Sequence, residues 1–212
     1  MRAFHWTLVA LVATSWVSAE IGGNAMQFHE WSGFTILTLV LFRLLWGFLG
    51  GTHARFKAFV RGPREVWAYA ASLLRGRQAF HAGHNPLGGW MILALLASLL
   101  VQTGTGLFAN DDIMAEGPLA RHVSKQTSDL LSKVHEANFD LFLALILLHV
   151  AAVLYYLVVR HDNLIVPMLT GRKDLPEGVD PPPAQSAPLW LAVVLLLACA
   201  SVVYALVHYG GR

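Results

Sequence analysis

The sequence predicts an all-α integral membrane protein, and three observations carry that prediction. Hydrophobic residues make up 56% of the 212 residues and charged residues only 13%, a balance typical of membrane proteins. The apolar residues form continuous runs close to the ~20 residues that a helix needs to cross the hydrocarbon. These runs lack the alternation of a strand, and a helix satisfies its backbone hydrogen bonds internally. The runs predict five spans, at about 3–19, 31–50, 87–109, 137–159 and 188–209.

The first run admits two interpretations. MRAFHWTLVALVATSWVSAE has a basic residue, an apolar stretch and small residues at 17–19, as a cleavable signal peptide does. Trp6 and Trp16 are unusual in a short signal sequence, so we favour an uncleaved span. Cleavage would remove His5. A glycine-containing turn of a few residues leads on to the second span, and so short a connection predicts an antiparallel neighbour.

Basic residues gather in two segments between the runs. The positive-inside rule places both in the cytoplasm, with the N-terminus cytoplasmic and the C-terminus periplasmic. The basic residues flank the spans and form no patch with interleaved aromatic residues, so we expect contact with membrane lipid and none with nucleic acid. They are Arg55, Lys57, Arg61, Arg64, Arg75 and Arg77 in the first segment, and Arg160, Arg172 and Lys173 in the second.

The chain divides into a core over 1–173, a proline-rich linker over 174–187 and a fifth transmembrane helix over 188–212. Within the cytoplasmic loop at about 51–86, PREVWAYAASLLRGR has helical apolar spacing among arginines. It predicts a helix that either lies on the membrane surface or connects two spans in solvent. The single cysteine, Cys199, excludes a disulfide framework and a Cys-x-x-Cys-His site for covalent haem, and we expect it to be a small core residue.

Four histidines within the spans are the main functional signal, because an ionisable side chain in a membrane is costly. His135 and His149 are fourteen residues apart, which is ~21 Å of helix and nearly four turns, so they share one face of span four at opposite depths. His29 begins span two at the depth of His135. His5 begins span one at the depth of His149. We call His29 and His135 the outer pair, and His5 and His149 the inner pair.

This ligand set indicates a cofactor class. Zinc or di-iron sites use clusters with carboxylate or thiolate ligands, whereas two imidazoles facing across an apolar slot suit the axial positions of a b-type haem. Gly33 and Gly47 share the His29 face of span two and leave room for a flat macrocycle or for close helix packing. Arg43 lies at the depth of the inner pair, where it either pairs with a haem propionate or anchors the helix at the interface.

Several stretches, RAFHW, FHEWSGF, FRLLWGFLGGTHARF, GHNPLGG and VHEANFDLF with LLHVAAVLYY, resemble the bacterial di-haem cytochrome b561 family, which includes the cytochrome b subunits of membrane nickel-iron hydrogenases. The resemblance covers about residues 2–173 and leaves the fifth span unexplained. It implies a four-helix core in the bacterial inner membrane that binds two non-covalent b haems, with His5, His29, His135 and His149 as ligands.

The resemblance also implies electron exchange between the quinone pool, as ubiquinone or menaquinone, and a periplasmic c-type cytochrome, a dehydrogenase or a hydrogenase. Two alternatives stay open. One branch of the family passes electrons from superoxide to ubiquinone, and Arg121, Lys125 and Lys133 near the outer pair would suit attraction of a small anion. A haem-free scaffold or transporter, whose histidines only bridge helices, is the other alternative.

Other polar residues rank below the four histidines. His84 in GHNPLGG is either a donor to a propionate or quinone oxygen near the inner pair or an ordinary loop residue. Asp140 points about 140° away from His135 around span four and is a weak candidate for proton transfer. We expect no iron ligand among the remaining histidines, which are His53, His81, His122, His161 and His208.

Overall fold

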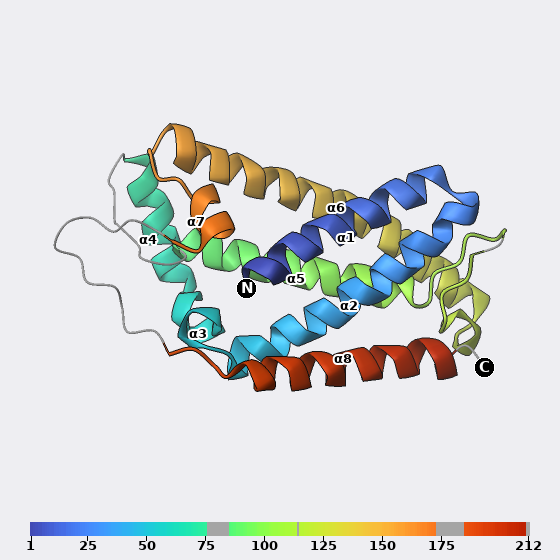
Figure 1. Ribbon diagram of the computed structural model, residues 1–212. Coiled ribbons are helices and arrows are strands. Elements are labelled where there is room, and N and C mark those ends of the chain that lie inside the picture. The colour runs from blue at the N-terminus through green and yellow to red at the C-terminus, as the bar shows by residue number, and fades with distance from the viewer. Residues whose placement is uncertain (76–84, 114, 173–184, 211–212) are drawn as a thin grey trace.

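The computed structural model describes residues 1–75, 85–113, 115–172 and 185–210, and helices dominate all four ranges. Over these residues there is no β-strand, only an isolated bridge between Asn110 and Glu116. Five long helices run lengthwise side by side (Figure 1), which confirms the predicted all-α class. They are α1 (Arg2–Ile21), α2 (Met26–Leu49), α5 (Pro86–Gly106), α6 (Lys125–Val158) and α8 (Leu189–Gly210). The shorter elements are η1 (Gly23–Ala25), η2 (Thr52–Ala54), α3 (Phe56–Phe59), α4 (Pro63–Leu74), η3 (Ala120–His122) and α7 (Ile165–Thr170).

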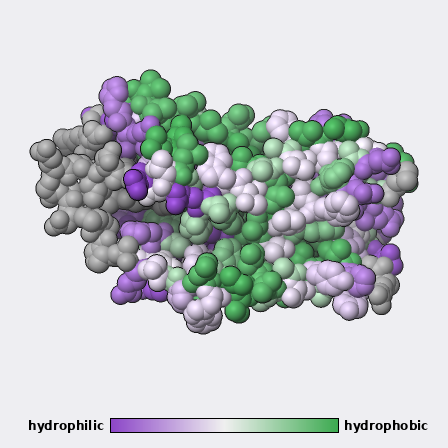
Figure 2. Space-filling model, viewed as in Figure 1, coloured by the Kyte–Doolittle hydropathy of each residue, from purple (hydrophilic) through white to green (hydrophobic). Residues whose placement is uncertain are grey.

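Among the described residues, four helical segments have the length and composition to cross a membrane: α5, α6, α8 and Gly23–Leu49, which consists of η1 and α2. In the view of Figure 2, most of the strongly hydrophilic side chains lie toward the two ends of the molecule. The helix α1 is not among the four. The predicted crossing at 3–19 therefore stays a prediction.

The turn between α1 and α2 depends on two glycines. Gly22 and Gly23 have φ angles of 66° and 54°, in the left-handed region that side chains disfavour. The Gly22 amide donates to the Ser18 carbonyl at 3.1 Å, which ends α1 and lets η1 reverse the chain. The predicted antiparallel hairpin is confirmed, since α2 runs back along α1 (Figure 1).

The core lies where α2, α5 and α6 meet. Val40 of α2 is fully buried and packs with Ile36, Leu99 of α5 and Phe142 of α6, and Leu8 of α1 covers this cluster. Because Phe142 falls midway between His135 and His149 on α6, this dry apolar cluster lies between the depths of the two histidine pairs.

The helix α8 packs along α2. Val203 of α8 is buried with Leu37 of α2 and Leu107, just beyond α5. The chain before α8 is fixed to the end of α2, because the Gln185 carbonyl accepts from the Thr52 amide at 3.0 Å. Cys199 is buried on α8, as expected of a small core residue. Most of the predicted linker at 174–187 lies outside the described residues.

The loop helix predicted from PREVWAYAASLLRGR is α4. It lies across one end of the bundle (Figure 1) and is amphipathic, with Tyr69 9% exposed and Trp67 78% exposed. The Tyr69 hydroxyl bonds the Tyr156 hydroxyl of α6 at 2.7 Å, and this bond ties α4 to the bundle. Its position on a membrane surface stays a prediction.

The helix α6 begins twelve residues earlier than the predicted span at 137–159. Ser124 caps it by accepting from the Thr127 amide at 3.2 Å, and Lys125 pairs with Asp129 one turn on. The cap and the ion pair stabilise the first turns of the helix, but these residues are polar. A prediction based on hydropathy therefore does not include them in the span. At 34 residues, or ~51 Å, α6 exceeds the ~30 Å of hydrocarbon, and its first turns project beyond the apolar zone.

Candidate functional site

The rings of the outer pair, on α2 and α6, lie close together in an edge-to-face arrangement. The centroids of the His29 and His135 rings are 6.0 Å apart, and the ring planes meet at 75°. A metal-bound imidazole nitrogen lies about 2 Å from its metal, so two imidazoles on opposite sides of one ion have ring centres about 6 Å apart. The outer pair has the spacing that a single shared iron requires.

Both outer imidazoles are oriented by oxygen atoms at Nδ1. His29 Nδ1 lies 3.0 Å from the Ser15 carbonyl oxygen and 3.1 Å from the Ser15 hydroxyl. His135 Nδ1 lies 2.9 Å from the Gln102 carbonyl oxygen and 3.3 Å from the Thr105 hydroxyl. A proton on each Nδ1 is donated to the carbonyl, which leaves the Nε2 lone pair free for a metal. This is the usual second contact of a metal-binding histidine.

Two glycines shape the space around the outer pair. A Cβ atom on Gly106, the last residue of α5, would lie 3.0 Å from His135 Cε1, so glycine lets α5 approach the imidazole. A Cβ atom on Gly33, one turn after His29, would meet nothing within 4 Å. Gly33 therefore borders open space, as a flat macrocycle needs. Gly47 differs, because the ring of Phe56 occupies the position of its missing side chain.

The inner pair comprises His5, in the first turn of α1, and His149, in the later part of α6. Both residues are partly buried. Trp6, whose ring is 5.0 Å from that of His5, donates from Nε1 to the Met168 carbonyl at 3.0 Å and so ties α1 to α7. His5 Nδ1 is buried and has no hydrogen-bond partner among the described residues. The inner pair thus lacks at His5 the carbonyl contact of the outer pair.

Arg43 is buried on α2, fourteen residues after His29. It is 5% exposed, and its guanidinium lies 4.9 Å from the ring centre of Phe56 and 5.8 Å from that of Phe59. No described residue accepts a hydrogen bond from Nη1. A buried cation with an unused donor is costly unless an anion accompanies it, and a haem propionate fits that need.

The structure describes only some of the remaining candidates. His84 and His81 lie outside the described residues. Asp140 is exposed on α6. His122 Nε2 contacts the Gly210 carbonyl at 2.6 Å, which holds the end of α8, and His208 stacks on Tyr204 with ring centres 5.3 Å apart.

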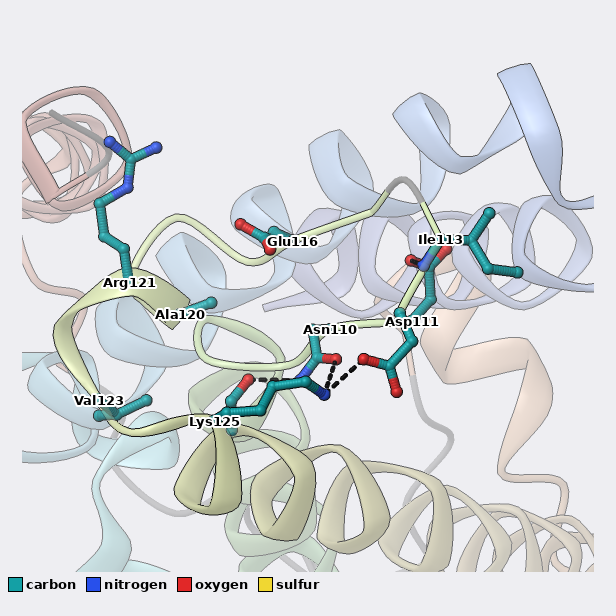
Figure 3. Close-up of a pocket in the computed structure, with 10 residues that line it drawn as sticks. Asn110, Asp111, Ile113, Glu116, Ala120, Arg121, Val123 and Lys125 are labelled. Atoms are coloured by element: carbon teal, nitrogen blue, oxygen red, sulfur yellow. Dashed lines mark hydrogen bonds and ion pairs between the residues drawn. The ribbon is translucent and has the colours of Figure 1, made fainter.

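A polar pocket lies at the start of α6 (Figure 3). Ser128, which lines it, precedes His135 by about two helical turns. Lys125 there contacts the carboxylates of Asp112 and Asp129 and donates to Asn110 Oδ1 at 3.1 Å. Arg121 extends away from Lys125. Two carboxylates balance the Lys125 charge, so this residue adds little to any attraction of a small anion.

Five residues around the outer pair escape the sequence analysis. Ser15 and Gln102 act through backbone carbonyls, which have no side-chain signature. Polar Gln102 and Asn138 inside apolar spans are the available signal, since an amide in hydrocarbon requires partners. The five are Ser15, Gln102, Thr105, Gly106 and Asn138.

Helices suited to cross a membrane, with imidazoles facing each other between them, define a class of membrane proteins that bind a metal or haem inside a bundle. The model of the prokaryotic cytochrome b561 family matches residues 1–171, and the chain belongs to this family. It is therefore a multi-pass bacterial membrane cytochrome b that binds haem b and serves electron transfer. No curated protein and no solved structure matches the chain. The helix α8 lies beyond the matched residues.

Proposed function

We propose that the protein carries electrons through the bacterial inner membrane between a periplasmic or membrane redox partner and the quinone pool, using two b haems. The single observation that carries this proposal is the outer pair, whose 6.0 Å ring separation suits one shared iron. Each haem, when bound, exchanges single electrons. The residues of the chain hold, orient and insulate the two haems.

At the outer site, His29 and His135 would hold the haem iron through their Nε2 atoms. The carbonyls of Ser15 and Gln102 select the tautomer in which Nε2 carries the free lone pair. Open space beside Gly33 admits the flat edge of the macrocycle. A haem held by both histidines would supply one-electron transfer, since two protein ligands suit that role.

At the inner site, His5 and His149 are the proposed ligands and Arg43 the proposed partner of a propionate. Phe56 and Phe59 flank the guanidinium and keep water from it, which strengthens its attraction for an anion. The unused donors at His5 Nδ1 and Arg43 Nη1 support this assignment, because each gains an acceptor if a propionate or an ordered water enters.

The positive-inside rule supports a direction for the two sites. With the α4 end in the cytoplasm, the outer pair faces the periplasm and a c-type cytochrome, a dehydrogenase or a hydrogenase, while the inner pair faces the cytoplasm. We place the quinone near the inner pair. Reduction of a quinone to a quinol takes two electrons and two protons, so the quinone site must receive electrons one at a time and admit protons.

The test is a reduced-minus-oxidised spectrum with pyridine haemochrome quantification on the purified protein. Two b haems per chain are expected. One haem would contradict the inner pair and direct attention to loss of His5 by cleavage. Protein without haem, after expression with ample haem, would identify a scaffold or transporter.

Superoxide oxidation is tested separately by stopped-flow decay of superoxide in the presence of ubiquinone. The neutralised Lys125 leads us to expect no acceleration by the protein. A decay rate that rises with protein concentration would establish the superoxide:ubiquinone activity instead.

A further inference from the structure

Asn138 lies on α6 one turn from His135 and bonds α5 three times. Its Nδ2 donates to the Ser98 carbonyl at 3.0 Å and to Gln102 Oε1 at 2.6 Å. Its Oδ1 accepts from the Ser98 hydroxyl at 3.2 Å. Ser98 is only 5% exposed, so these bonds form away from water.

This arrangement uses every polar group that the amide offers toward α5. Both protons of Nδ2 are donated and Oδ1 is accepting, so the amide is fully paired within an apolar span. A paired amide costs little in hydrocarbon, whereas an unpaired one is strongly disfavoured. The network therefore stabilises one register of α6 along α5 and disfavours other registers.

Gln102 contacts α6 through both its side chain and its backbone carbonyl. Asn138 binds its side-chain oxygen, and its backbone carbonyl accepts the Nδ1 proton of His135 at 2.9 Å. A shift of α5 along α6 would break both contacts together. The position of the Gln102 carbonyl, and with it the orientation of the His135 imidazole, depends on Asn138.

We propose that Asn138 is a positioning residue for the outer haem, holding the Gln102 carbonyl against His135 and so keeping the potential of that haem low. A hydrogen bond donated from Nδ1 makes the imidazole more basic, and a more basic ligand favours the ferric iron. The inference rests on the proposed function, because it requires a haem between His29 and His135.

The test compares Asn138→Leu and Gln102→Leu with Thr103→Val in the full-length, haem-loaded protein. Thr103 is the matched control, since its hydroxyl bonds the Leu99 carbonyl of its own helix at 2.8 Å. Each variant is titrated potentiometrically, and the low-spin ferric signals are recorded by electron paramagnetic resonance. Asn138→Leu should raise the midpoint potential of the outer haem and move its signal, and leave the inner haem unchanged. Gln102→Leu should act in the same direction without adding to Asn138→Leu, and Thr103→Val should change neither haem.

A milder variant covers the case in which Asn138→Leu loses the outer haem. Ser98→Ala removes only the bond to Asn138 Oδ1 and should shift the outer potential in the same direction by less. If Asn138→Leu binds the outer haem with the wild-type potential and signal, the inference is overturned. If Asn138→Leu binds no outer haem, the wild-type potential and signal in Ser98→Ala would overturn it. Wild-type protein without an outer haem would instead contradict the proposed function, so the two failures are distinguishable.

Discussion

The outer and inner pairs differ in what surrounds their imidazoles. In the outer pair both Nδ1 atoms face backbone carbonyls, from Ser15 and Gln102. In the inner pair, His5 Nδ1 has no partner among the described residues, and the buried cation Arg43 lies on α2 at the depth predicted for this pair. The two pairs thus differ at Nδ1, and we expect Arg43 to add a positive charge at the inner pair.

This difference predicts an order of potentials. Carbonyl acceptors make the outer imidazoles more basic and favour ferric iron, whereas a buried cation favours the added electron of ferrous iron. We therefore expect the outer haem to have the lower potential and electrons to run from the periplasmic side inward. Inward transfer works against the membrane potential, at about 2.3 kcal/mol per electron per 100 mV for a full crossing, and the drop in potential offsets part of that cost.

The largest effect should come from removing a ligand. His135→Ala is expected to lose the outer haem and retain the inner one, and His149→Ala the reverse, because each iron then lacks one axial nitrogen. Pyridine haemochrome and difference spectra measure this. His53→Ala, at an exposed histidine of η2, should keep both haems. Two intact haem spectra in His135→Ala would disprove the ligand assignment.

Neutralising Arg43 should act on the inner haem alone. Arg43→Gln removes the buried positive charge and should lower the inner midpoint potential by about 60 mV, a tenfold change for one electron. Potentiometric titration reports this shift. Arg61→Gln is the control, since Arg61 is exposed and lies 3.9 Å from Glu65. Equal shifts in both variants would mean that Arg43 acts only through overall charge.

A methyl group on Gly106 should weaken the outer site. Its Cβ would lie 3.0 Å from His135 Cε1, and the displaced ring should reduce outer haem binding by about 1 kcal/mol, the low end for overpacking. Haem titration of the apoprotein measures the loss. Gly104→Ala is matched on the same helix, because its Cβ meets nothing within 4 Å, and should leave binding unchanged. Equal binding by the two variants would contradict the α5 contact.

The smallest expected effect is that of Ser15→Ala. The change removes the hydroxyl 3.1 Å from His29 Nδ1 and keeps the Ser15 carbonyl, which still accepts the proton. The outer potential should rise by about 20 mV, the low end of what one hydrogen bond contributes. Thr14→Val, which loses a bond within its own helix to Ala10, should show no shift. A shift as large as that of Arg43→Gln would assign the hydroxyl, not the carbonyl, the main role.

The sequence is sufficient to predict the candidate functional side chains that are ionisable and lie within apolar spans. Helix rise and periodicity predict that His29 and His135 share a depth, and in the structure their rings face each other. Arg43 stands out as a charge in an apolar span, and the structure buries it. A charged or ionisable residue within a predicted span is easy to recognise in the sequence, because its neighbours are apolar.

The contacts that distinguish the two pairs are less visible in the sequence. Every residue has a carbonyl, so nothing marks those of Ser15 and Gln102 until helix packing selects them. The start of α6 at Lys125 depends on a cap and an ion pair, and hydropathy detects neither. An amide within an apolar span marks Asn138 in the sequence. Its hydrogen-bond partners lie on another helix, so the sequence alone does not identify them.

The most direct test is a potentiometric titration of the wild-type protein alongside His135→Ala and His149→Ala. We expect two one-electron b-haem transitions in the wild type, of which His135→Ala loses the lower and His149→Ala the higher. A single transition in the wild type, or survival of the lower transition in His135→Ala, would contradict this expectation.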